Sequence, residues 1–274
     1  MTGPVLVFGA NGLVGRRVVG RWGSGCVGLG REVDVRDPRA VERALRAHHP
    51  RAVLLLAAFT AVDAAESAPE AWSCNALAPL VVARACAARR LPLWWVSTDH
   101  VFDGRLGRPL TEQDAPCPIN AYGVGKRAGE LAVLALGGRV LRTSWVLGAD
   151  GGVAARFLAK AGSAIEVVDD AFGTPTDADG LADALVALVD SSGDAIPDVL
   201  HVAGPHGATW VDVARALLGP DTSVLPVSSA RRPTAARRPV DGRLDVARFR
   251  AWYGRDLPRV VGADDVGMVA LDGV

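Results

Sequence analysis

Tyr122 and Lys126 have the residue types and the spacing of a proton-transfer pair. They form the pattern Tyr-x-x-x-Lys within residues 120–130. Four residues apart on a helix, the two side chains lie on one face. A lysine ammonium beside a phenol stabilises the phenolate, so we expect Lys126 to lower the pKa of Tyr122 from its usual value of about 10. Tyr122 would then exchange a proton near neutral pH. The spacing is also common on solvated helices, so the interpretation needs support from elsewhere in the chain.

A glycine turn near the N-terminus gives that support. The apolar run Val5–Phe8 is typical of a buried parallel strand, and a helical stretch follows at residues 16–22. Between them lies Gly-x-x-Gly-x-x-Gly. We expect Gly9 to permit the tight turn, Gly12 to let a pyrophosphate approach the backbone, and Gly15 to let the helix pack closely on the strand. The free N–H groups of the helix N-terminus would bind the anion. The pattern predicts a dinucleotide cofactor.

Composition favours a cytoplasmic enzyme. The chain has 274 residues, half of them apolar, and 30 basic residues balance 30 acidic ones. Without a basic stripe, we expect no nucleic-acid partner. The sequence has no apolar run of about 18 residues and no pattern of a signal peptide, so we expect no membrane association. The four cysteines lack metal-ligand spacing, and we expect reduced thiols: Cys26, Cys74, Cys86 and Cys117.

Alternating strands and helices predict the architecture. The pattern indicates an α/β fold, a doubly wound parallel Rossmann sheet with a smaller C-terminal substrate-binding lobe. We expect the NAD(P)-binding domain over residues 1–145 and mainly the lobe over 146–274, with segments near 165–203 returning to the sheet. Strands are expected at 5–8, 26–29, 52–56, 93–96, 139–142, 165–168 and 199–202, and helices at 16–22, 37–48, 69–90, 121–136 and 177–191.

Polar residues after two strands are candidates for substrate contacts. Thr98 follows the fourth strand and could hydrogen-bond a substrate carbonyl, while Asp99 could hold a sugar hydroxyl. Thr60 and Val62 follow the third strand and fall at the same edge. Local turn capping explains such Ser, Thr and Asp residues equally well. The segment 231–239 carries four arginines, which would either grip a diphosphate or lie in a solvated loop.

In these segments the chain resembles the extended short-chain dehydrogenases/reductases, and among them the dTDP-4-dehydrorhamnose reductases. The matching segments are spread across nearly the whole chain in family order. They are Gly-Ala-Asn-Gly-Leu-Val-Gly (9–15), Ala-Ala-Phe-Thr-Ala-Val-Asp (57–63), Asn-Ala (75–76), Ser-Thr-Asp-His-Val-Phe-Asp-Gly (97–104), the Tyr-Lys segment, Leu-Arg-Thr-Ser-Trp-Val-Leu-Gly (141–148), Gly-Thr-Pro-Thr (173–176), Arg-Pro (238–239) and Arg-Leu-Asp (243–245).

The resemblance implies an activity and a set of site residues. Thr98, Tyr122 and Lys126 would form the catalytic triad, NADPH would donate a hydride, and a nucleotide-linked, dTDP-type 4-keto-6-deoxyhexose would accept it. No metal is expected. Cofactor binding would involve Gly9, Asn11, Gly12, Leu13, Val14, Gly15, Arg31, Asp34, Val35, Ala57, Ala58, Tyr122 and Lys126. Substrate binding would involve Thr60, Val62, Asp99, Trp145 and Arg238.

Related enzymes of the same fold leave alternatives open. The nucleotide-sugar dehydratases carry Asp-Glu after the threonine, whereas this chain has Asp99-His100, which argues against dehydration. An epimerase would use the same triad, and a non-catalytic NADP-binding regulatory subunit would share the fold. The family's usual motifs are altered at residues 152–154 and 238–244, and Leu56 replaces a usual Asn. Which deoxysugar is reduced, including those of antibiotic pathways, therefore stays open.

Two further expectations concern the cofactor and the assembly. The second strand ends Gly28-Leu-Gly30-Arg31-Glu32. If Gly30 occupies the place of the acidic residue of NAD-specific folds, Arg31 can pair with a 2′-phosphate, which predicts NADPH, with NADH as the alternative. A shift of one residue would instead place Glu32 there. The surplus of apolar residues on helices 69–90 and 121–136 predicts a homodimer through these helices, without a bridging metal.

Overall fold

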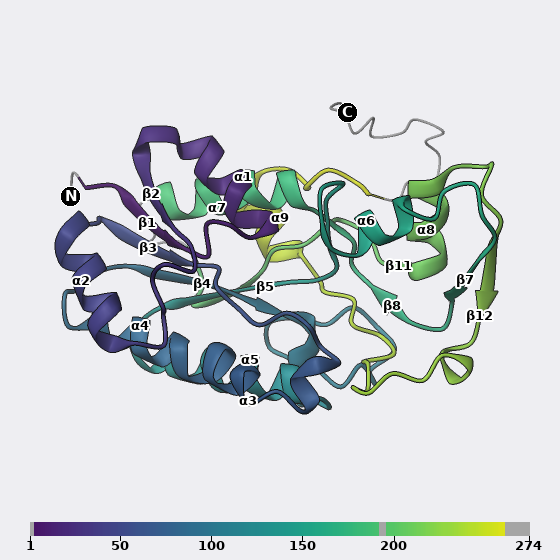
Figure 1. Ribbon diagram of the computed structural model, residues 1–274, viewed down its shortest axis with the longest axis horizontal. Helices are drawn as coiled ribbons and strands as arrows, with labels where there is room; N and C mark the ends of the chain where they lie inside the picture. The colour runs from purple at the N-terminus through teal and green to yellow at the C-terminus, as the bar shows by residue number, and fades with distance from the viewer. Residues whose placement is uncertain (1–2, 192–195, 261–274) are drawn as a thin grey trace.

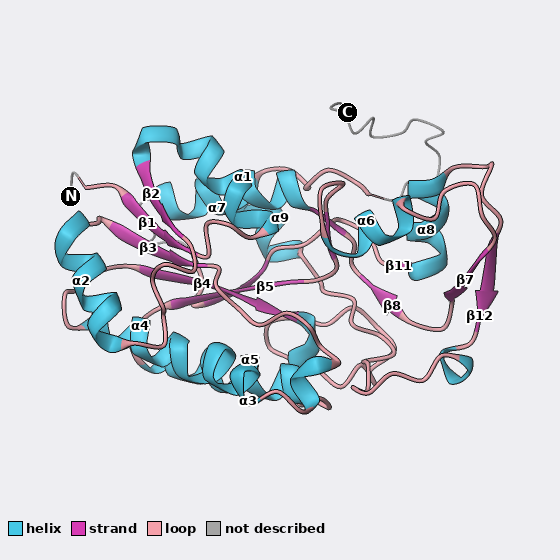
Figure 2. Cartoon of the chain, viewed as in Figure 1, coloured by secondary structure: helices cyan, strands magenta, loops and turns pink. Residues whose placement is uncertain are grey.

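A parallel sheet of six strands forms the part of the molecule on the left of Figures 1 and 2. The computed structural model describes residues 3–191 and 196–260. The strand order is β10-β5-β4-β3-β1-β2, so the order reverses between β1 and β3. This confirms the predicted doubly wound α/β fold. The strands are β1 (Val5–Phe8), β2 (Cys26–Leu29), β3 (Ala52–Leu55), β4 (Leu93–Thr98), β5 (Arg139–Thr143) and β10 (Val199–His201).

The central strands are apolar on both faces because helices cover both sides of the sheet. In β1, Val5 and Val7 join one core cluster, while Leu6 and Phe8 join the other. One face is covered by α1 (Leu13–Trp22), α7 (Ala178–Asp190) and α9 (Ala247–Tyr253). The opposite face, lower in Figure 1, is covered by α2 (Pro38–His48), α4 (Ala78–Ala87) and α5 (Ala121–Ala135). As expected, Asp37 caps α2 and Pro38 begins it.

The helix expected over residues 69–90 is interrupted. It consists of α3 (Pro69–Trp72), a π-helical turn (η3, Ser73–Leu77) and α4. The turn points the buried Asn75 towards the loop after β3, where its amide donates to the Phe59 carbonyl and accepts from the Phe59 N–H, both at 2.9 Å. These bonds hold the β3 loop against the helix. A short 3₁₀ turn, η2 (Ala64–Glu66), lies within the same connection.

A second group of elements forms the lobe at the right of Figure 1. It contains α6 (Gly152–Leu158), α8 (Trp210–Leu218) and three strand pairs outside the large sheet. The pairs are β6 (Val146–Leu147) with β9 (Thr176–Asp177), β7 (Ile165–Val168) with β12 (Val224–Val227), and β8 (Phe172–Gly173) with β11 (Ala208–Thr209). The remaining 3₁₀ turns are η1 (Gly23–Gly25), η4 (Asp99–Val101) and η5 (Ser229–Arg231).

The expectation that segments near 165–203 return to the large sheet is wrong for β7. Ile165 and Val167 face α8, where they pack against Val211 and Ala214. The alternate residues Glu166 and Val168 are less buried, so β7 has a single covered face, unlike the strands of the central sheet. From the same region, α7 and β10 do lie with the large sheet.

The glycine turn after β1 is sterically required at two positions. Gly9 has φ +89°, and a Cβ there would lie 2.5 Å from the Ala57 nitrogen. At Gly15 a Cβ would lie 2.2 Å from the Gly9 carbonyl oxygen. Gly12 has only that same oxygen nearby, at 3.3 Å, so its outer side is open. These contacts support the separate tasks expected of the three glycines.

Two glycines of α1 give a matched test of this packing. Gly15→Ala should destabilise the protein, by about 1–3 kcal/mol as for an overpacked site, because its Cβ meets backbone atoms. Gly20→Ala should stabilise it by about 0.5–1 kcal/mol, since Gly20 is exposed with nothing near its Cβ and alanine favours helix. Denaturant unfolding measures both changes; equal effects of the two substitutions would contradict the packing role of Gly15.

Candidate active site

The three residues of the expected triad meet where β4 ends and α5 begins. Thr98 is the last residue of β4, and Tyr122 and Lys126 lie one turn apart on α5. Asn120 caps α5, because its side chain accepts a hydrogen bond from the Gly123 N–H at 2.7 Å. A Cβ on Gly123 would lie 2.1 Å from the His100 carbonyl oxygen. Glycine at 123 therefore lets the first turn of α5 rest directly on η4.

Tyr122 is buried beside His100 and Thr98. Its ring packs edge-on against the His100 imidazole, with centroids 5.4 Å apart, and it joins a small apolar cluster with Ala65 and Ala71. Burial raises the pKa of Tyr122 to about 12; the Thr98 hydroxyl lowers it and the Asp99 charge raises it further. The expected lowering of the Tyr122 pKa is therefore wrong for this arrangement. At neutral pH the phenol is protonated, the form that donates a proton.

The position of the Lys126 ammonium explains why the pKa of the Tyr122 phenol is not lowered. The ammonium is turned towards the strand, where it donates to the Val96 carbonyl at 2.7 Å and lies 4.0 Å from the centre of the Trp95 ring. Burial lowers the pKa of Lys126 to about 7, and the Glu130 charge opposes that effect. A lysine that is largely desolvated and half neutral near pH 7 contributes less positive potential at Tyr122 than a charged surface lysine would.

Thr98 is fixed by a network of buried polar groups. Its hydroxyl donates to one carboxylate oxygen of Asp99 at 2.9 Å and accepts from the His100 N–H at 3.2 Å. The other Asp99 oxygen accepts from the Ser144 hydroxyl at 2.9 Å, and Ser144 accepts from the Thr174 N–H at 3.2 Å. Asp99 thus links the ends of β4 and β5 to the segment before β9. It is buried and engaged within the protein, and its binding of a sugar hydroxyl stays a prediction.

A buried ion pair lies one turn further along α5. Glu130 is fully buried and accepts two hydrogen bonds from Arg142, each 2.8 Å, and one from Arg127 at 2.9 Å. Burial opposes its ionisation, but the bonds from Arg142 outweigh that effect and lower the Glu130 pKa. Arg142 also lies 3.5 Å from the His201 Nε2 atom. Burial, and then the Arg142 charge, lower the His201 pKa to about 3. His201 is therefore neutral beside a permanent cation.

The glycine turn fits the pyrophosphate of a dinucleotide. Helix α1 begins at Leu13 with Gly12 as N-cap, and no side chain caps the helix. Its first turn contains no acidic residue. The first N–H groups of α1 are therefore free to bind an anion, as the helix dipole favours. Ala57 lies against Gly9 across the edge of the sheet. The expected contacts of Asn11, Val14 and Ala58 with a cofactor stay predictions.

At the end of β2 both candidate side chains lie close together. Glu32 turns back to accept a hydrogen bond from the Gly30 N–H, so a carboxylate does lie at this strand end. Among the described residues, none forms an ion pair or a hydrogen bond with the exposed Arg31 guanidinium. Further along, Asp34 is paired with Arg36 at 2.8 Å and Val35 is buried. Arg31 is free to take a new anionic partner, whereas Asp34 is already occupied.

The expected substrate residues have unequal settings. Val62 packs in the cluster that contains Tyr122, and Thr60 is exposed beside it. Arg238 lies near His100. Burial lowers the pKa of His100, and the positive charge of Arg238 lowers it further. The Arg238 guanidinium pairs with Asp63 at 2.8 Å. Trp145, with φ +40°, stacks on Trp210 at 3.7 Å between centroids.

The arginine segment 231–239 is only partly solvated. Arg231 pairs with Glu166 and Arg232 donates to the Glu166 carbonyl. The Arg237 carbonyl accepts from the Asn120 side chain at 2.7 Å, which holds this segment over the start of α5. The Arg237 guanidinium has no partner within the described ranges. A role for Arg237 or Arg238 in binding a diphosphate stays a prediction.

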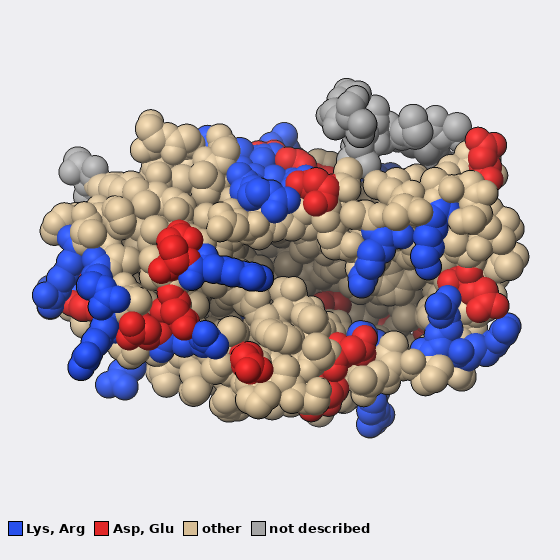
Figure 3. Space-filling view, in the orientation of Figure 1, with Lys and Arg blue, Asp and Glu red and all other residues tan. Residues whose placement is uncertain are grey.

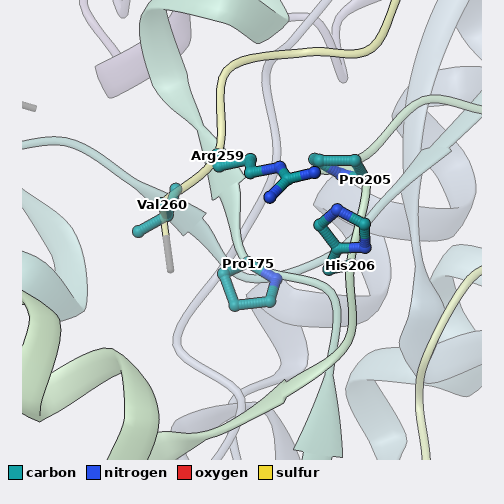
Figure 4. Close-up of a pocket in the computed structure, with 5 residues that line it drawn as sticks. All are labelled: Pro175, Pro205, His206, Arg259 and Val260. Carbon is teal, nitrogen blue, oxygen red and sulfur yellow. The ribbon is translucent and has the colours of Figure 1, made fainter. Parts of the chain in front are cut away.

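The cleft itself is visible in the space-filling view. In Figure 1 the strands of the large sheet point towards the lobe, and Figure 3 shows a hollow between the two parts, bordered by charged side chains. A separate cavity of about 10 Å³, large enough for one water, lies beside the segment before β9 (Figure 4). No member of the triad lines it. Its walls are formed by Pro175, Pro205, His206, Arg259 and Val260.

Comparisons with known proteins agree with this geometry. The family model for the RmlD substrate binding domain matches residues 2–260. The chain is 39% identical to a dTDP-4-dehydrorhamnose reductase from Streptomyces griseus, over 90% of this chain and 86% of that protein. This chain belongs to the dTDP-4-dehydrorhamnose reductase family. It is also 37% identical to a probable dTDP-4,6-dihydroxy-2-methyloxan-3-one 4-ketoreductase from Streptomyces antibioticus, over 89% of this chain and 88% of that one.

A solved structure of the same family shares the fold. The Bacillus anthracis dTDP-4-dehydrorhamnose reductase, solved in complex with NADP, superposes with a TM-score of 0.85 at 27% identity. The match covers 95% of this chain and 96% of that one. No helix within residues 3–191 and 196–260 is long and apolar enough to cross a membrane. The same residues hold no cluster of three or more metal-ligating side chains, and Arg16, next to the glycine turn, pairs with Asp150.

Several residues around the triad were not singled out from the sequence. Trp95, Glu130 and Arg142 surround or support Lys126, and Asn120 caps α5. Glu130 continues the spacing of the pair, since residues 122, 126 and 130 lie on one helix face. An arginine within the apolar strand segment 139–143 was a second signal, because a buried cation needs an acidic partner. The two signals together identify the Glu130–Arg142 pair.

The buried charge of Lys126 gives a test that needs no substrate. Because its pKa is lowered to about 7, the cost of burying the charge is fully present below pH 7 and disappears as pH rises towards 10.5. Lys126→Met should therefore raise the free energy of unfolding near pH 6 by about 2–4 kcal/mol. The gain should shrink between pH 7 and pH 10. Urea unfolding at several pH values measures it; a pH-independent difference would show that Lys126 is not buried as a strained cation.

Proposed function

We propose that this protein reduces the 4-keto group of a dTDP-linked 4-keto-6-deoxyhexose with NADPH. The observation that carries the proposal is the meeting of Thr98, Tyr122 and Lys126 at the carboxyl end of β4, in a member of the dTDP-4-dehydrorhamnose reductase family. Ligands of open α/β sheets bind at this edge. The four free thiols fit the cytoplasmic location that we also propose.

Each side chain of the triad has a task that its environment permits. Tyr122, protonated at neutral pH, donates a proton to the C4 oxygen as that oxygen becomes an alkoxide. The Thr98 hydroxyl lies beside Tyr122, and to hydrogen-bond the same oxygen it must exchange its bond to Asp99. Lys126 holds a proton that it can supply to Tyr122 after the transfer, because its pKa of about 7 lies near the working pH.

The cofactor supplies the hydride when bound. Gly12 and the first N–H groups of α1 would hold its pyrophosphate, and Arg31 would hold a 2′-phosphate. Glu32 is exposed and accepts a hydrogen bond from the Gly30 N–H, so this contact already engages its carboxylate at the strand end. We propose a preference for NADPH over NADH, because the attraction of Arg31 for the 2′-phosphate outweighs the repulsion from the nearby Glu32.

A substrate screen tests the function directly. The purified protein is mixed with NADPH and the dTDP-, UDP- and GDP-linked 4-keto-6-deoxysugars, and loss of NADPH absorbance is followed. We expect turnover with a dTDP sugar. Tyr122→Phe, which removes one hydroxyl, should lower kcat by roughly 10²–10⁴ and leave NADPH affinity nearly unchanged. If none of the sugars is turned over, the proposed function is rejected. If Tyr122→Phe turns over nearly as fast as the unmodified protein, the role of Tyr122 as proton donor is rejected.

The cofactor preference has its own test. We expect kcat/KM to favour NADPH over NADH by about 1–3 kcal/mol, the value of a charge-assisted contact. Arg31→Ala should remove most of this preference, chiefly by raising KM for NADPH. Arg39→Ala, which removes an exposed arginine at the start of α2, is the matched control and should keep it. Equal use of both cofactors by the unmodified protein would leave Arg31 as a solvated surface charge.

We also propose a homodimer through the helices below the sheet in Figure 1. Helix α5 packs against α3, η3 and α4, and this group exposes four large apolar side chains: Trp72, Leu77, Val124 and Leu131. Such exposure on neighbouring helices is characteristic of an interface. Light scattering at micromolar concentration should give the mass of two chains, unchanged by a chelator.

Leu131→Glu should convert this dimer to a monomer, because it places a charge in the apolar contact. Leu106→Glu changes a similarly exposed leucine in the loop after η4 and should leave the mass unchanged. A single-chain mass for the unmodified protein would contradict the dimer, and dissociation by the chelator would contradict a metal-free interface.

A further inference from the structure

Lysine is rare in this chain. Lys126 and Lys160 are its only lysines, although it carries 30 lysine and arginine residues in all. Arginine remains charged in essentially every protein environment, whereas a buried lysine can lose its proton. The chain therefore uses arginine for almost every cation and places one of its two lysines within the proposed triad. The groups that hold the Lys126 ammonium decide how readily it gives up that proton.

The Lys126 ammonium is held without a carboxylate. It lies 4.0 Å from the centre of the Trp95 ring and donates to the Val96 carbonyl at 2.7 Å. Within the described part of the chain no Asp or Glu oxygen lies within 4 Å of it. Two acidic groups of the site have other partners: Glu130 is bonded to Arg142 and Arg127, and Asp99 to Thr98 and Ser144.

Besides Glu130, this face of α5 carries the titratable Tyr122, which is neutral over the same pH range. Two cations, Arg142 on β5 and Arg127 on α5, are both paired with Glu130. The ring and the carbonyl are thus the direct contacts that favour the charged form of Lys126.

The sequence around Trp95 is adapted to this contact. Trp95 is buried, and its ring tip lies directly beneath Gly129, where a Cβ would approach the Trp95 Cη2 atom to 2.5 Å. The same Cβ would lie 2.5 Å from the Asn75 carbonyl oxygen in the π-helical turn. Glycine at 129 therefore makes the space in which the indole lies under α5. The ring is therefore in close contact with α5, the helix that carries Lys126.

We propose that Trp95 is a positioning residue, whose ring together with the Val96 carbonyl forms a seat for the Lys126 ammonium in place of a carboxylate counter-ion. An aromatic face attracts a cation through its quadrupole, but carries no net charge. The seat stabilises the ammonium enough to keep it folded into the site, and leaves it able to release a proton or to turn towards a bound cofactor. This inference rests on the proposed function only where it links Lys126 to Tyr122.

The direction of the effect follows from opposing contributions. Burial lowers the Lys126 pKa to about 7, and the Glu130 charge opposes that fall. The seat, which favours the charged form, would oppose it as well. Removal of the ring should therefore lower the pKa of Lys126 further. Since a cation–π contact is worth only part of a salt bridge, we expect the midpoint to fall by about 0.5–1 pH unit in Trp95→Leu. Trp95→Phe keeps a weaker ring and should give an intermediate value.

The rarity of lysine makes this measurement direct. The full-length protein is labelled with ¹³C,¹⁵N-lysine, and the side-chain signals of its two lysines are followed by NMR from pH 5 to pH 10. Lys160 is exposed and serves as the internal reference. Trp94→Leu is the matched control, because it removes an equally buried indole on the opposite face of β4, beside Arg139 rather than Lys126. It should destabilise the protein comparably and leave the Lys126 midpoint unchanged.

The seat is supported if the midpoint falls in the order unmodified protein, Trp95→Phe, Trp95→Leu, with Trp94→Leu unchanged. It is overturned if the Trp95 variants keep the original midpoint, or if Trp94→Leu moves it equally. Should Trp95→Leu not fold, Trp95→Phe alone decides in the same way. With substrate, the alkaline limb of the kcat/KM profile should move with the NMR midpoint. A moved midpoint without turnover on any sugar would support the seat and reject the proposed function.

Discussion

The close approach of α5 to the end of β4 is the constraint on which the site depends. Two glycines of this helix permit it: a Cβ at Gly123 would meet the His100 carbonyl oxygen at 2.1 Å, and one at Gly129 would meet Trp95 at 2.5 Å. A third, Gly125, faces the π-helical turn η3, where a Cβ would meet Asn75 at 3.3 Å. Each glycine lowers helix propensity by about 1 kcal/mol relative to alanine. In return for this lower helix propensity, α5 packs closely enough to bury the side chains of Tyr122 and Lys126.

Burial then determines the electrostatics. It keeps Tyr122 protonated and makes Lys126 a weak cation, and these are the states that the proposed roles of proton donor and proton store require. One turn away along α5, the charge of Glu130 is balanced by Arg142. Closer to the triad, Asp99 is held by the hydroxyls of Thr98 and Ser144. Desolvation and neutral contacts such as the Trp95 ring therefore organise much of the site.

Much of the fold was predictable because its signals are local. A fully apolar strand, a glycine turn and a helix cap identify β1, α1 and α2 from their own residues. The interruption at Ser73–Leu77 was not predictable, because it depends on the bonds of Asn75 to Phe59 in a distant loop. The partner of β7 was missed for the same reason: Ile165–Val168 reads as a strand, but only α8 and β12 decide which sheet it joins.

In the site, too, local features were predictable from the sequence and contacts between distant segments were not. Spacing and the family resemblance predicted Tyr122, Lys126 and Thr98 as site residues, and the structure brings the three together, whereas the direction of the Tyr122 pKa shift was predicted wrongly. Helix spacing places the lysine on the correct face, but it does not show that the ammonium turns to Val96 and Trp95. Nor does it show that Asp99 and Arg238 already have partners in Ser144 and Asp63. Rotamers and burial are properties of the packed structure.

The central claim is that a hydride reaches the sugar C4 atom while Tyr122 protonates its oxygen. The most direct test supplies NADPH deuterated at the transferable nicotinamide position, with a dTDP-4-keto-6-deoxyhexose in ordinary water, and examines the product by NMR and mass spectrometry. The account predicts one deuterium, located at C4, and a C4 hydroxyl. Oxidation of the cofactor without deuterium in the sugar, or deuterium at another carbon, would contradict it.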